Sequence, residues 1–225
     1  VIAFDIGFLE PDDRRVVRAL EEVESTLQDL MLGDERLEKQ LEALKVASDN
    51  DRQLAAAIGD CRAEVVLGYF FQMTEDVLDH MSPEEIDRHH KNIQGSAYKT
   101  VRFESAEAQR VPLIQAVVPQ SNIRIISEAT DYAGFFNMYP DPDGVVRWMP
   151  GVVRSKEVLY APLSLVATSA YLQEPLSLEV AEYGVEQIRL GEMNIPTDEF
   201  GRILINYRGE EKTFPHIPVT DILND

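Results

Sequence analysis

Apolar residues along this chain gather in short runs that polar turn residues separate. In the stretch 134–153, the runs GFFNM and VVRWM stand on either side of PDPDG at 140–144. Pro fixes φ, Asp hydrogen-bonds its own backbone and Gly accepts a positive φ, so PDPDG favours a tight turn. The pattern predicts a β-hairpin with a five-residue loop. Because both runs are apolar at most positions, we expect this hairpin to lie in a sheet that is covered on both faces.

Two further runs, VIAFDIGF at 1–8 and VVLGYFF at 65–71, have the continuous hydrophobicity of buried strands. We expect 1–8 to be a central parallel strand. A short helix at 51–61 lies between the two runs, with three candidate N-cap residues at 48–50. The order strand, helix, strand predicts a parallel sheet with a right-handed crossover.

The remaining segments give shorter signals. Ser82, Pro83 and Glu85 make a capping box that begins a polar helix ending near His90. The other expected elements are a surface loop at 92–110, a helix at 122–131, a buried helix at 162–172, strands at 185–190 and 202–207, and an extended C-terminal segment that becomes helical at Thr220.

Residues 16–44 carry a heptad seam with alternating spacings of four and three. Asp34, preceded by Gly33, stands where the seam should continue. The segment is either one helix of roughly 45 to 50 Å with a weak point, or two shorter helices folded back at Gly33, which we favour. The seam packs either on its own domain or against a second subunit, and both readings stay open. Its apolar positions are Val16, Leu20, Val23, Leu27, Leu30, Leu37, Leu41 and Leu44.

Together these elements predict an α/β fold. A mostly parallel or mixed central sheet is covered by helices on both faces, and a long helical arm, hairpin or coiled-coil-like, occupies 13–46 near the N-terminus. With 225 residues, the chain is long enough for one large domain or two small ones.

The charge balance excludes two classes of partner. The chain has 40 acidic and 21 basic residues, and its net charge of −19 repels nucleic-acid phosphates and anionic lipid headgroups. The single cysteine, Cys61, cannot form an intramolecular disulfide, and we expect it to be a small packing residue. The chain begins in an apolar strand without Met, so we expect a fragment whose targeting or membrane segments lie outside it.

Common enzyme signatures are missing from the sequence. It has no glycine-rich phosphate loop, nucleophile elbow, paired-cysteine motif or zinc helix, so we expect no catalytic residue, no cofactor and no metal. His89 and His90 are adjacent on a helix and point about 100° apart, which does not suit one metal, and we expect both to be solvated. The DPDG at 141–144 resembles the start of a calcium loop, but Val145 and Val146 offer no ligands, which favours a plain turn.

Four residues are candidates for a ligand pocket. Asp5 lies in the middle of the first strand, where it is either at the carboxyl-end crevice of the sheet or, as we favour, bonded to loop backbone. Arg147 lies inside an apolar strand and needs a carboxylate partner, such as Asp5 or Asp141, if it is buried. Tyr207 and Arg208 end their strand, where they line a pocket or, as we favour, close the sheet edge.

Six blocks of the chain, in order, together resemble the CHASE type 2 sensory domain. They are AFDIGFLEPD at 3–12, LAAAI at 54–58, VVLGYFF at 65–71, GFFNMYPDPDGVVRWMP at 134–150, IPTDEFGRILINYRG at 195–209 and FPHIPVTDIL at 214–223. The blocks cover most of the chain, which implies a single domain over 1–225 with a helical insertion at 13–46. The resemblance supplies no catalytic motif.

This resemblance implies an extracytoplasmic, periplasmic module of a bacterial receptor that is anchored in the inner membrane by segments outside this chain. The output of such receptors is a nucleotide cyclase, for example an adenylate cyclase, or a protein kinase, for example a histidine kinase. The implied signal is an unknown small molecule or protein. Because such receptors commonly act as dimers, we expect a homodimer through the helical arm, through the membrane segments, or through both.

A second hypothesis comes from a different class of protein. A small-molecule hydrolase or binding enzyme on a doubly wound sheet is also consistent with an α/β pattern. The missing motifs and the resemblance favour the sensor, which itself would not be an enzyme.

Overall fold

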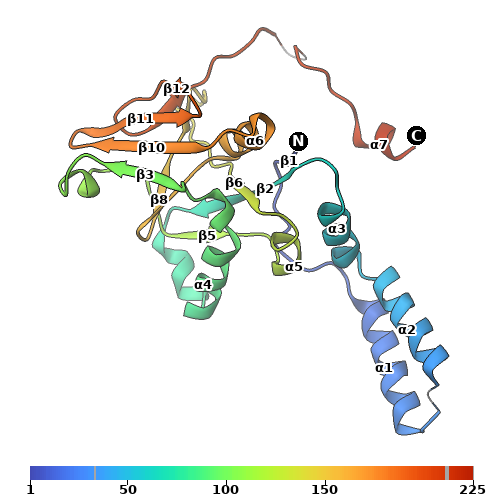
Figure 1. The fold of residues 1–225 in the computed structure, drawn as a ribbon. Coiled ribbons are helices and arrows are strands. Elements are labelled where there is room, and N and C mark those ends of the chain that lie inside the picture. The colour runs from blue at the N-terminus through green and yellow to red at the C-terminus, as the bar shows by residue number, and fades with distance from the viewer. Residues whose placement is uncertain (33, 211–212, 225) are drawn as a thin grey trace.

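The computed structural model describes residues 1–32, 34–210 and 213–224. Strand β2 (Val65–Gln72) lies at the centre of a four-stranded sheet (Figure 1). Strands β1 (Ile2–Phe4) and β6 (Tyr132–Phe135) pair with it in parallel, and β5 (Val118–Gln120) pairs antiparallel with its last residues. The predicted order strand, helix, strand with parallel pairing is therefore confirmed.

Helices cover both faces of this sheet. On one face, α3 (Asn50–Gly59) and the short α5 (Arg124–Ser127) pack through Ile58 and Ile126 against Val65 and Leu67 of β2. Val66 points to the other face because successive strand residues alternate. There it belongs to a core with α6 (Leu163–Leu172), the expected buried helix.

Close packing of α6 on β6 depends on a glycine. A Cβ on Gly134 would stand 2.6 Å from the backbone nitrogen of Leu163, which is too close for any side chain. This position therefore needs Gly so that the helix and the strand can approach.

The other described strands form three further sheets. One has the order β12-β11-β10-β3, in which β3 is parallel to β10 and the other pairs are antiparallel. A two-stranded ribbon joins β7 and β13, and a third sheet has the order β4-β8-β9. Their bounds are β3 Thr100–Phe103, β4 Gln115–Ala116, β7 Trp148–Pro150, β8 Val153–Ser155, β9 Val158–Tyr160, β10 Leu176–Ala181, β11 Gly184–Leu190, β12 Met193–Ile195 and β13 Arg202–Leu204. The structure is thus α/β with mixed sheets, as the sequence predicts.

Several local predictions agree with the structure. The N-cap of α3 is Asp49, whose side chain accepts from the backbone nitrogen of Arg52. The helix α4 (Pro83–Asn92) begins with the expected capping box of Ser82 and Glu85. A helix, α7 (Val219–Leu223), follows the extended C-terminal segment. In the part of the chain that the structure describes, three short 3-10 helices occupy Glu75–His80, Gln94–Ser96 and Ala108–Arg110.

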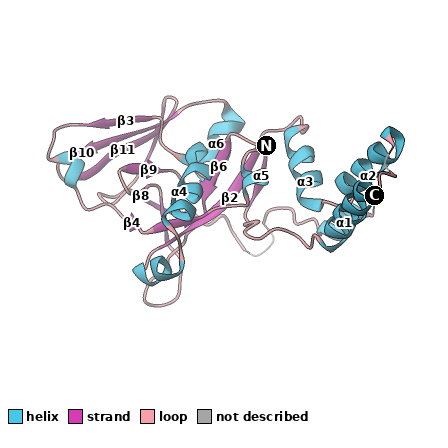
Figure 2. Cartoon of the chain, turned by 90° about the horizontal axis from the view of Figure 1, so that it is seen from below, coloured by secondary structure: helices cyan, strands magenta, loops and turns pink. Residues whose placement is uncertain are grey.

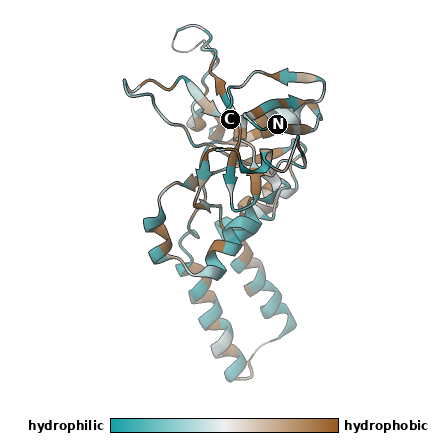
Figure 3. Ribbon diagram, turned by 90° about the vertical axis from the view of Figure 1, so that its left-hand side faces the viewer, coloured by the Kyte–Doolittle hydropathy of each residue, from teal (hydrophilic) through white to brown (hydrophobic). Residues whose placement is uncertain are grey.

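The heptad segment forms two helices and not one. Helices α1 (Arg15–Asp29) and α2 (Glu35–Ala47) fold back on each other and extend away from the sheets (Figures 1 and 2). Asp34 is the N-cap of α2, while Gly33, the expected turn position, lies outside the described residues. We call residues 15–47 the helical hairpin. Its ribbon is mostly hydrophilic, with hydrophobic residues at intervals (Figure 3).

The heptad seam is divided between the inside and the outside of the helical hairpin. Leu41 is buried together with Val17, a residue that the predicted seam did not include. Beside them Lys45 binds Glu24 at 2.8 Å with its side chain only 12% exposed. Four seam residues instead face solvent, namely Val16, Val23, Leu30 and Leu44.

The predicted β-hairpin at 134–153 is wrong, although its turn is right. Strand β6 pairs with β2, whereas β7 pairs with β13 in a separate ribbon. After β6 the side chain of Asn137 continues the contact with β2, because it accepts from the nitrogen of Phe71 at 2.7 Å and donates to the oxygen of Phe71 at 2.9 Å. The turn itself forms, with a hydrogen bond from Gly144 to Asp141 and a φ of 83° at Gly144.

Two other predictions need correction. The run 1–8 yields only the short strand β1, whose one described neighbour is β2 and whose Ile2 is exposed, so it is not central. The segment 92–110 is not a surface loop, because it contains β3 and the buried residues Ile93 and Tyr98. The partner of β3 is β10, a strand that the sequence reading did not predict.

Candidate functional site

The ribbon of β7 and β13 separates two pockets. Arg202 of β13 stands opposite Pro150 of β7, and Trp148 lies two residues away on the same face. These three residues line a pocket of about 530 Å³, which we call the Arg202 pocket. Met149, which points to the opposite face, lines a smaller pocket of about 230 Å³ together with Asp5.

A tight turn before β13 fixes the Arg202 side chain. Asp198 accepts hydrogen bonds from the backbone nitrogens of Phe200 at 3.1 Å and Arg202 at 2.8 Å. Its second oxygen accepts from Nε of Arg202 at 2.7 Å, and its side chain is only 14% exposed. Gly201 takes a φ of 74°, which lets the turn close. The sequence DEFGR thus folds as a local device that orients one guanidinium.

Two aromatic rings flank the same guanidinium. Its carbon lies 5.2 Å from the centre of the Trp148 ring and 5.3 Å from the centre of the Phe200 ring. At these distances the ring quadrupoles attract the cation. Arg202 is therefore held by one carboxylate and lies over two aromatic rings.

The rest of the Arg202 pocket is mainly apolar. The turn at 139–142 supplies Tyr139 and two prolines, and more distant segments supply Met73 and Ile114. Burial raises the pKa of the Tyr139 hydroxyl, which keeps this group neutral. Asp141 also lines the pocket, with its carboxylate bound to Arg147.

Arg147, a predicted pocket candidate, is instead part of the turn. Its guanidinium binds both oxygens of Asp143, at 2.9 and 2.7 Å, and one oxygen of Asp141 at 2.8 Å. The hydrogen bond from Arg147 is the main cause of a lowered pKa at Asp143. The expected pairing with Asp141 is confirmed, but the Arg147 side chain is 45% exposed and not buried. The carboxylates of Asp141 and Asp143 therefore already bind this guanidinium.

Tyr207 closes the edge of the ribbon, as we favoured from the sequence. Its hydroxyl donates to the Val146 carbonyl at 2.5 Å, and Ile205 donates to the Arg147 carbonyl at 2.8 Å. Both bonds continue the contact between the two segments beyond the pair of Leu204 and Trp148. Arg208 is exposed beyond them.

Asp5 lies at the carboxyl end of β1, as the crevice reading requires. Its pocket is lined by Phe135, Phe136 and Leu163, which follow or face the carboxyl end of β6. The bond to loop backbone that we favoured is wrong, because within the described ranges the Asp5 carboxylate has no protein hydrogen bond. The four sequence candidates are therefore not brought together in one site.

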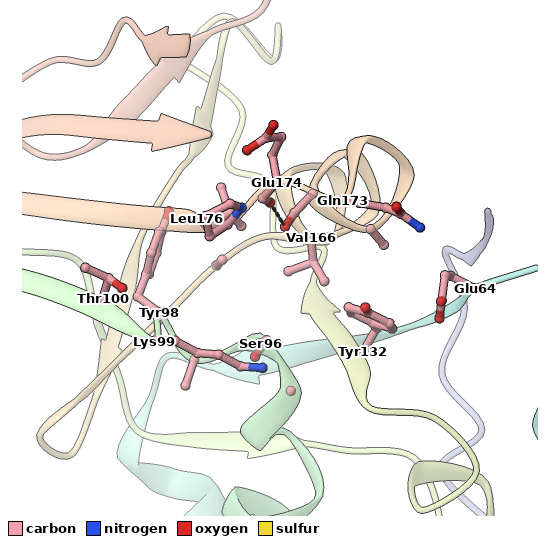
Figure 4. Close-up of a pocket in the computed structure, with 16 residues that line it drawn as sticks. Glu64, Ser96, Tyr98, Lys99, Thr100, Tyr132, Val166, Gln173, Glu174 and Leu176 are labelled. Atoms are coloured by element: carbon pink, nitrogen blue, oxygen red, sulfur yellow. Dashed lines mark hydrogen bonds between the residues drawn. The ribbon is translucent and has the colours of Figure 1, made fainter. Parts of the chain in front are cut away.

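A third pocket, of about 430 Å³, lies beside the C-terminal end of α6 (Figure 4). Tyr98 in its wall is buried and donates to the Gly151 carbonyl at 2.7 Å. Lys99 reaches into the space near Tyr132, and Glu64 lies beyond that ring (Figure 4). Lys99 is exposed and makes no ion pair in the described part of the chain. This pocket carries both charges, but nothing orients them as Asp198 orients Arg202.

The two histidines are half-buried and hydrogen-bonded to the protein, which corrects the prediction of solvated surface residues. Nδ1 of His89 accepts from the backbone nitrogen of Ser121 at 3.1 Å. Nδ1 of His90 donates to the Ile86 carbonyl at 2.8 Å, so its Nε2 accepts from the Ser155 hydroxyl at 3.0 Å. Burial is the main cause of a lowered pKa at both rings.

The pair of His90 and Ser155 does not make a hydrolase site. Ser155 is fully buried with an exposure of 0%, so a substrate cannot reach its hydroxyl. His90 uses its other nitrogen on a carbonyl of its own helix and not on an orienting carboxylate. The contact joins α4 to β8 and is structural.

The sequence reading missed Arg202, Trp148 and Phe200 as site residues. Two signals were present, namely the D-x-x-G-R pattern at 198–202 and the single tryptophan of the chain beside apolar residues. The sequence could not show that the two segments pair. Nor did it reveal that residues 139–142 close the same pocket.

Two features are absent from the described residues, namely a metal-binding cluster and a membrane-spanning helix. Within residues 1–32, 34–210 and 213–224, no group of three acidic, histidine or cysteine side chains is placed to hold a metal. Among the described helices, none has the length and hydrophobicity needed to cross a bilayer.

Comparison with protein families gave a match over almost the whole chain. The model of the CHASE2 domain matches residues 1–224. Comparisons with curated proteins and with solved structures gave no match. The sequence blocks that resemble this family include the Arg202 turn and the β7 strand. The chain belongs to the CHASE2 family, whose members are extracytoplasmic sensory domains of signalling receptors.

Proposed function

We propose that this chain is the input domain of a bacterial transmembrane receptor and that it regulates a nucleotide cyclase or a protein kinase inside the cell. The observation that carries the proposal is the Arg202 pocket in a member of a sensory family. Its volume of about 530 Å³ suits a small molecule. Its walls come from the turn at 139–142 and from β7 and β13, so an occupant would contact segments that are distant in the sequence.

The same proposal places the chain outside the cytoplasm, in the periplasm, with membrane segments supplied by the rest of the receptor. Its net charge of −19 supports a role that does not depend on contact with anionic lipid. A fusion of the parent protein to a reporter enzyme that is active only outside the cytoplasm tests the location. Reporter activity is expected when the fusion point lies within this chain, and activity only from cytoplasmic reporters would refute the placement.

We also propose that the chain itself is not catalytic. Two observations support this. The sequence lacks the common enzyme signatures, and Ser155, the serine that contacts His90, is fully buried. The purified chain should not turn over ester, phosphate or glycoside substrates. Turnover that a single carboxylate or serine substitution abolishes would contradict this.

We further propose that two copies of the chain associate through the helical hairpin. Four seam residues expose apolar side chains there, with Val16 58% and Leu30 59% exposed. A row of exposed apolar residues on a helix is typical of a surface that packs on a partner. The acidic residues around the seam favour an antiparallel or folded-back arrangement over a parallel zipper.

The output is tested on the parent receptor. Its coding sequence should contain hydrophobic spans and a cyclase or kinase domain beside this chain. Deleting residues 139–142, which close the Arg202 pocket, should change the rate of that output in membranes. A parent that has neither spans nor an output domain would overturn the proposal.

A further inference from the structure

We propose that the Arg202 pocket binds a small monocarboxylate whose body is apolar or aromatic. This inference deepens the proposed sensory function and rests on it for its biological role. The binding chemistry itself follows from the geometry around one guanidinium.

The first step of the argument is the set of donors that Arg202 leaves free. The Asp198 carboxylate accepts a hydrogen bond from Nε of Arg202. Within the described residues, neither terminal nitrogen of Arg202 donates to a protein acceptor. The two terminal nitrogens of a guanidinium match the two oxygens of a carboxylate in a bidentate pair. Because the contacts with Asp198, Trp148 and Phe200 already hold the side chain, little conformational entropy is lost when a ligand binds.

The second step concerns the body of the ligand. Next to the guanidinium, the pocket presents Trp148, Phe200 and Tyr139 together with Met73 and Ile114. A ring or a branched alkyl group of the ligand would lie in apolar surroundings among these side chains. Aromatic side chains pack well on a planar ring. Prolines of the 139–142 turn and of β7 complete the wall.

The third step concerns the charge of the ligand. Asp141 lies on the wall of the pocket, and the chain as a whole carries a charge of −19. The Asp198 carboxylate already pairs with Arg202, so a phosphate dianion or a dicarboxylate would place more negative charge beside Asp198 and Asp141 than this guanidinium can balance. A cationic ligand would meet the positive charge of Arg202. A single carboxylate therefore fits the site best.

Trp148 provides a direct readout, because it is the single tryptophan of the chain and lies in this pocket. We would titrate the 225-residue chain with phenylacetate, phenylacetamide, phenethylamine and phenyl phosphate and follow tryptophan emission. Phenylacetate should give a saturable change. The amide should bind at least about tenfold more weakly, since one charged hydrogen-bond pair is worth about 1.5 to 3 kcal/mol. Equal binding of acid and amide, or tighter binding of the amine or the phosphate, would overturn the ligand class.

Variants locate the interaction. Arg202→Gln should remove the preference for acid over amide, and Arg202→Lys should retain part of it because Lys keeps the charge but loses the bidentate fork. Arg102→Gln is the matched control, because Arg102 is 78% exposed on β3 and does not line this pocket. Circular dichroism checks that each variant is folded. If Arg202→Gln does not fold, Arg202→Lys with native dichroism and undiminished preference for the acid refutes the assignment, as does a wild-type chain without a saturable change at about 10 mM probe.

The failure of this inference and the failure of the proposed function are distinguishable. Binding is measured on the chain alone, whereas signalling is measured as the output of the parent receptor. A chain that binds phenylacetate in a receptor whose output never responds to pocket variants would refute the sensory role only. An output that depends on residues 139–142, with no carboxylate preference in the chain, would refute the ligand class only.

Discussion

The guanidinium carbon of Arg202 lies 5.2 Å from the centre of the Trp148 ring. The two residues are distant in sequence, and the antiparallel pairing of β7 and β13 brings them together. Asp198 holds Arg202 and the turn before it in place by accepting three hydrogen bonds. The single tryptophan of the chain therefore reports directly on the guanidinium that Asp198 binds.

Removing Asp198 should release Arg202. Asp198→Ala deletes an acceptor of three hydrogen bonds that is only 14% exposed, and we expect a loss of about 2 kcal/mol in the free energy of unfolding. The emission of Trp148 should change as well, because the stacked cation loses its anchor. Chemical denaturation and tryptophan fluorescence measure the two effects.

Asp143→Ala is the matched control for this prediction. Asp143 also binds an arginine four residues later, but both side chains of that pair are about half exposed. Solvent screens such pairs, so this variant should change stability little and leave Trp148 emission as in the wild type. A larger effect at Asp143 than at Asp198 would contradict our account of the two turns.

Gly144→Val should destabilise the turn at 141–144. The φ of 83° at Gly144 is one that a β-branched residue rarely adopts, so we expect a cost of about 1 to 3 kcal/mol. Apart from Gly144 and its two chain neighbours, no heavy atom of the described residues lies within 4 Å of the position of a new Cβ, so the cost comes from backbone strain and not from a clash. Gly144→Asn, which tolerates positive φ better, should cost less. Equal melting temperatures for Gly144→Val and the wild type would show that the strain is absent.

Acidification should weaken the packing of α4 on the sheets through His89 and His90. Burial lowers the folded-state pKa of both rings below the ordinary value of 6.5, so the fold favours the neutral form. This contribution is fully present above the unfolded pKa and is lost as pH falls through the folded pKa. The free energy of unfolding should therefore decrease between about pH 7 and about pH 5.

Replacing both histidines by Gln should flatten this pH dependence. The neighbouring charges act in both directions, since Lys156 and Arg88 lower the two pKa values while Asp87 and Glu85 raise them. His216, which is exposed near the C-terminus, offers the control substitution His216→Gln. A pH profile that is unchanged in the His89 and His90 variant would argue against this mechanism.

Substitutions in the helical hairpin should separate the association of two chains from the folding of one. Val23→Glu with Leu44→Glu changes two exposed seam residues, so light scattering should report a lower mass while circular dichroism stays native. Leu41→Glu places a charge where only 7% of the residue is exposed, and it should unfold the hairpin. A wild-type chain that stays monomeric at high micromolar concentration would defeat the proposed association.

The sequence by itself determined the features that depend on neighbouring residues. The capping box of Ser82, the N-cap of α3 and the Asp-Gly turn at 141–144 are all closed by hydrogen bonds within a few residues. The interrupted heptad at Asp34 favoured two helices over one without deciding between them, and the structure has Asp34 as the N-cap of the second helix. Local patterns also determined the α/β class, because runs of apolar residues alternate with capped helices.

Only the tertiary structure decided which segments meet. The runs on either side of the 140–144 turn look like two halves of a hairpin, but β6 pairs with β2, where Ala133 and Phe135 are buried, and β7 pairs with β13. Strands β3 and β10 lack a clear pattern and form a parallel pair across a long stretch of chain. His89 and His90 have the sequence context of surface residues, and only the tertiary structure brings Ser121 and Ser155 into hydrogen-bond contact with these half-buried rings. The Arg202 pocket arises for the same physical reason, since strand pairing and burial are cooperative over the whole chain and are not encoded in the spacing of any one segment.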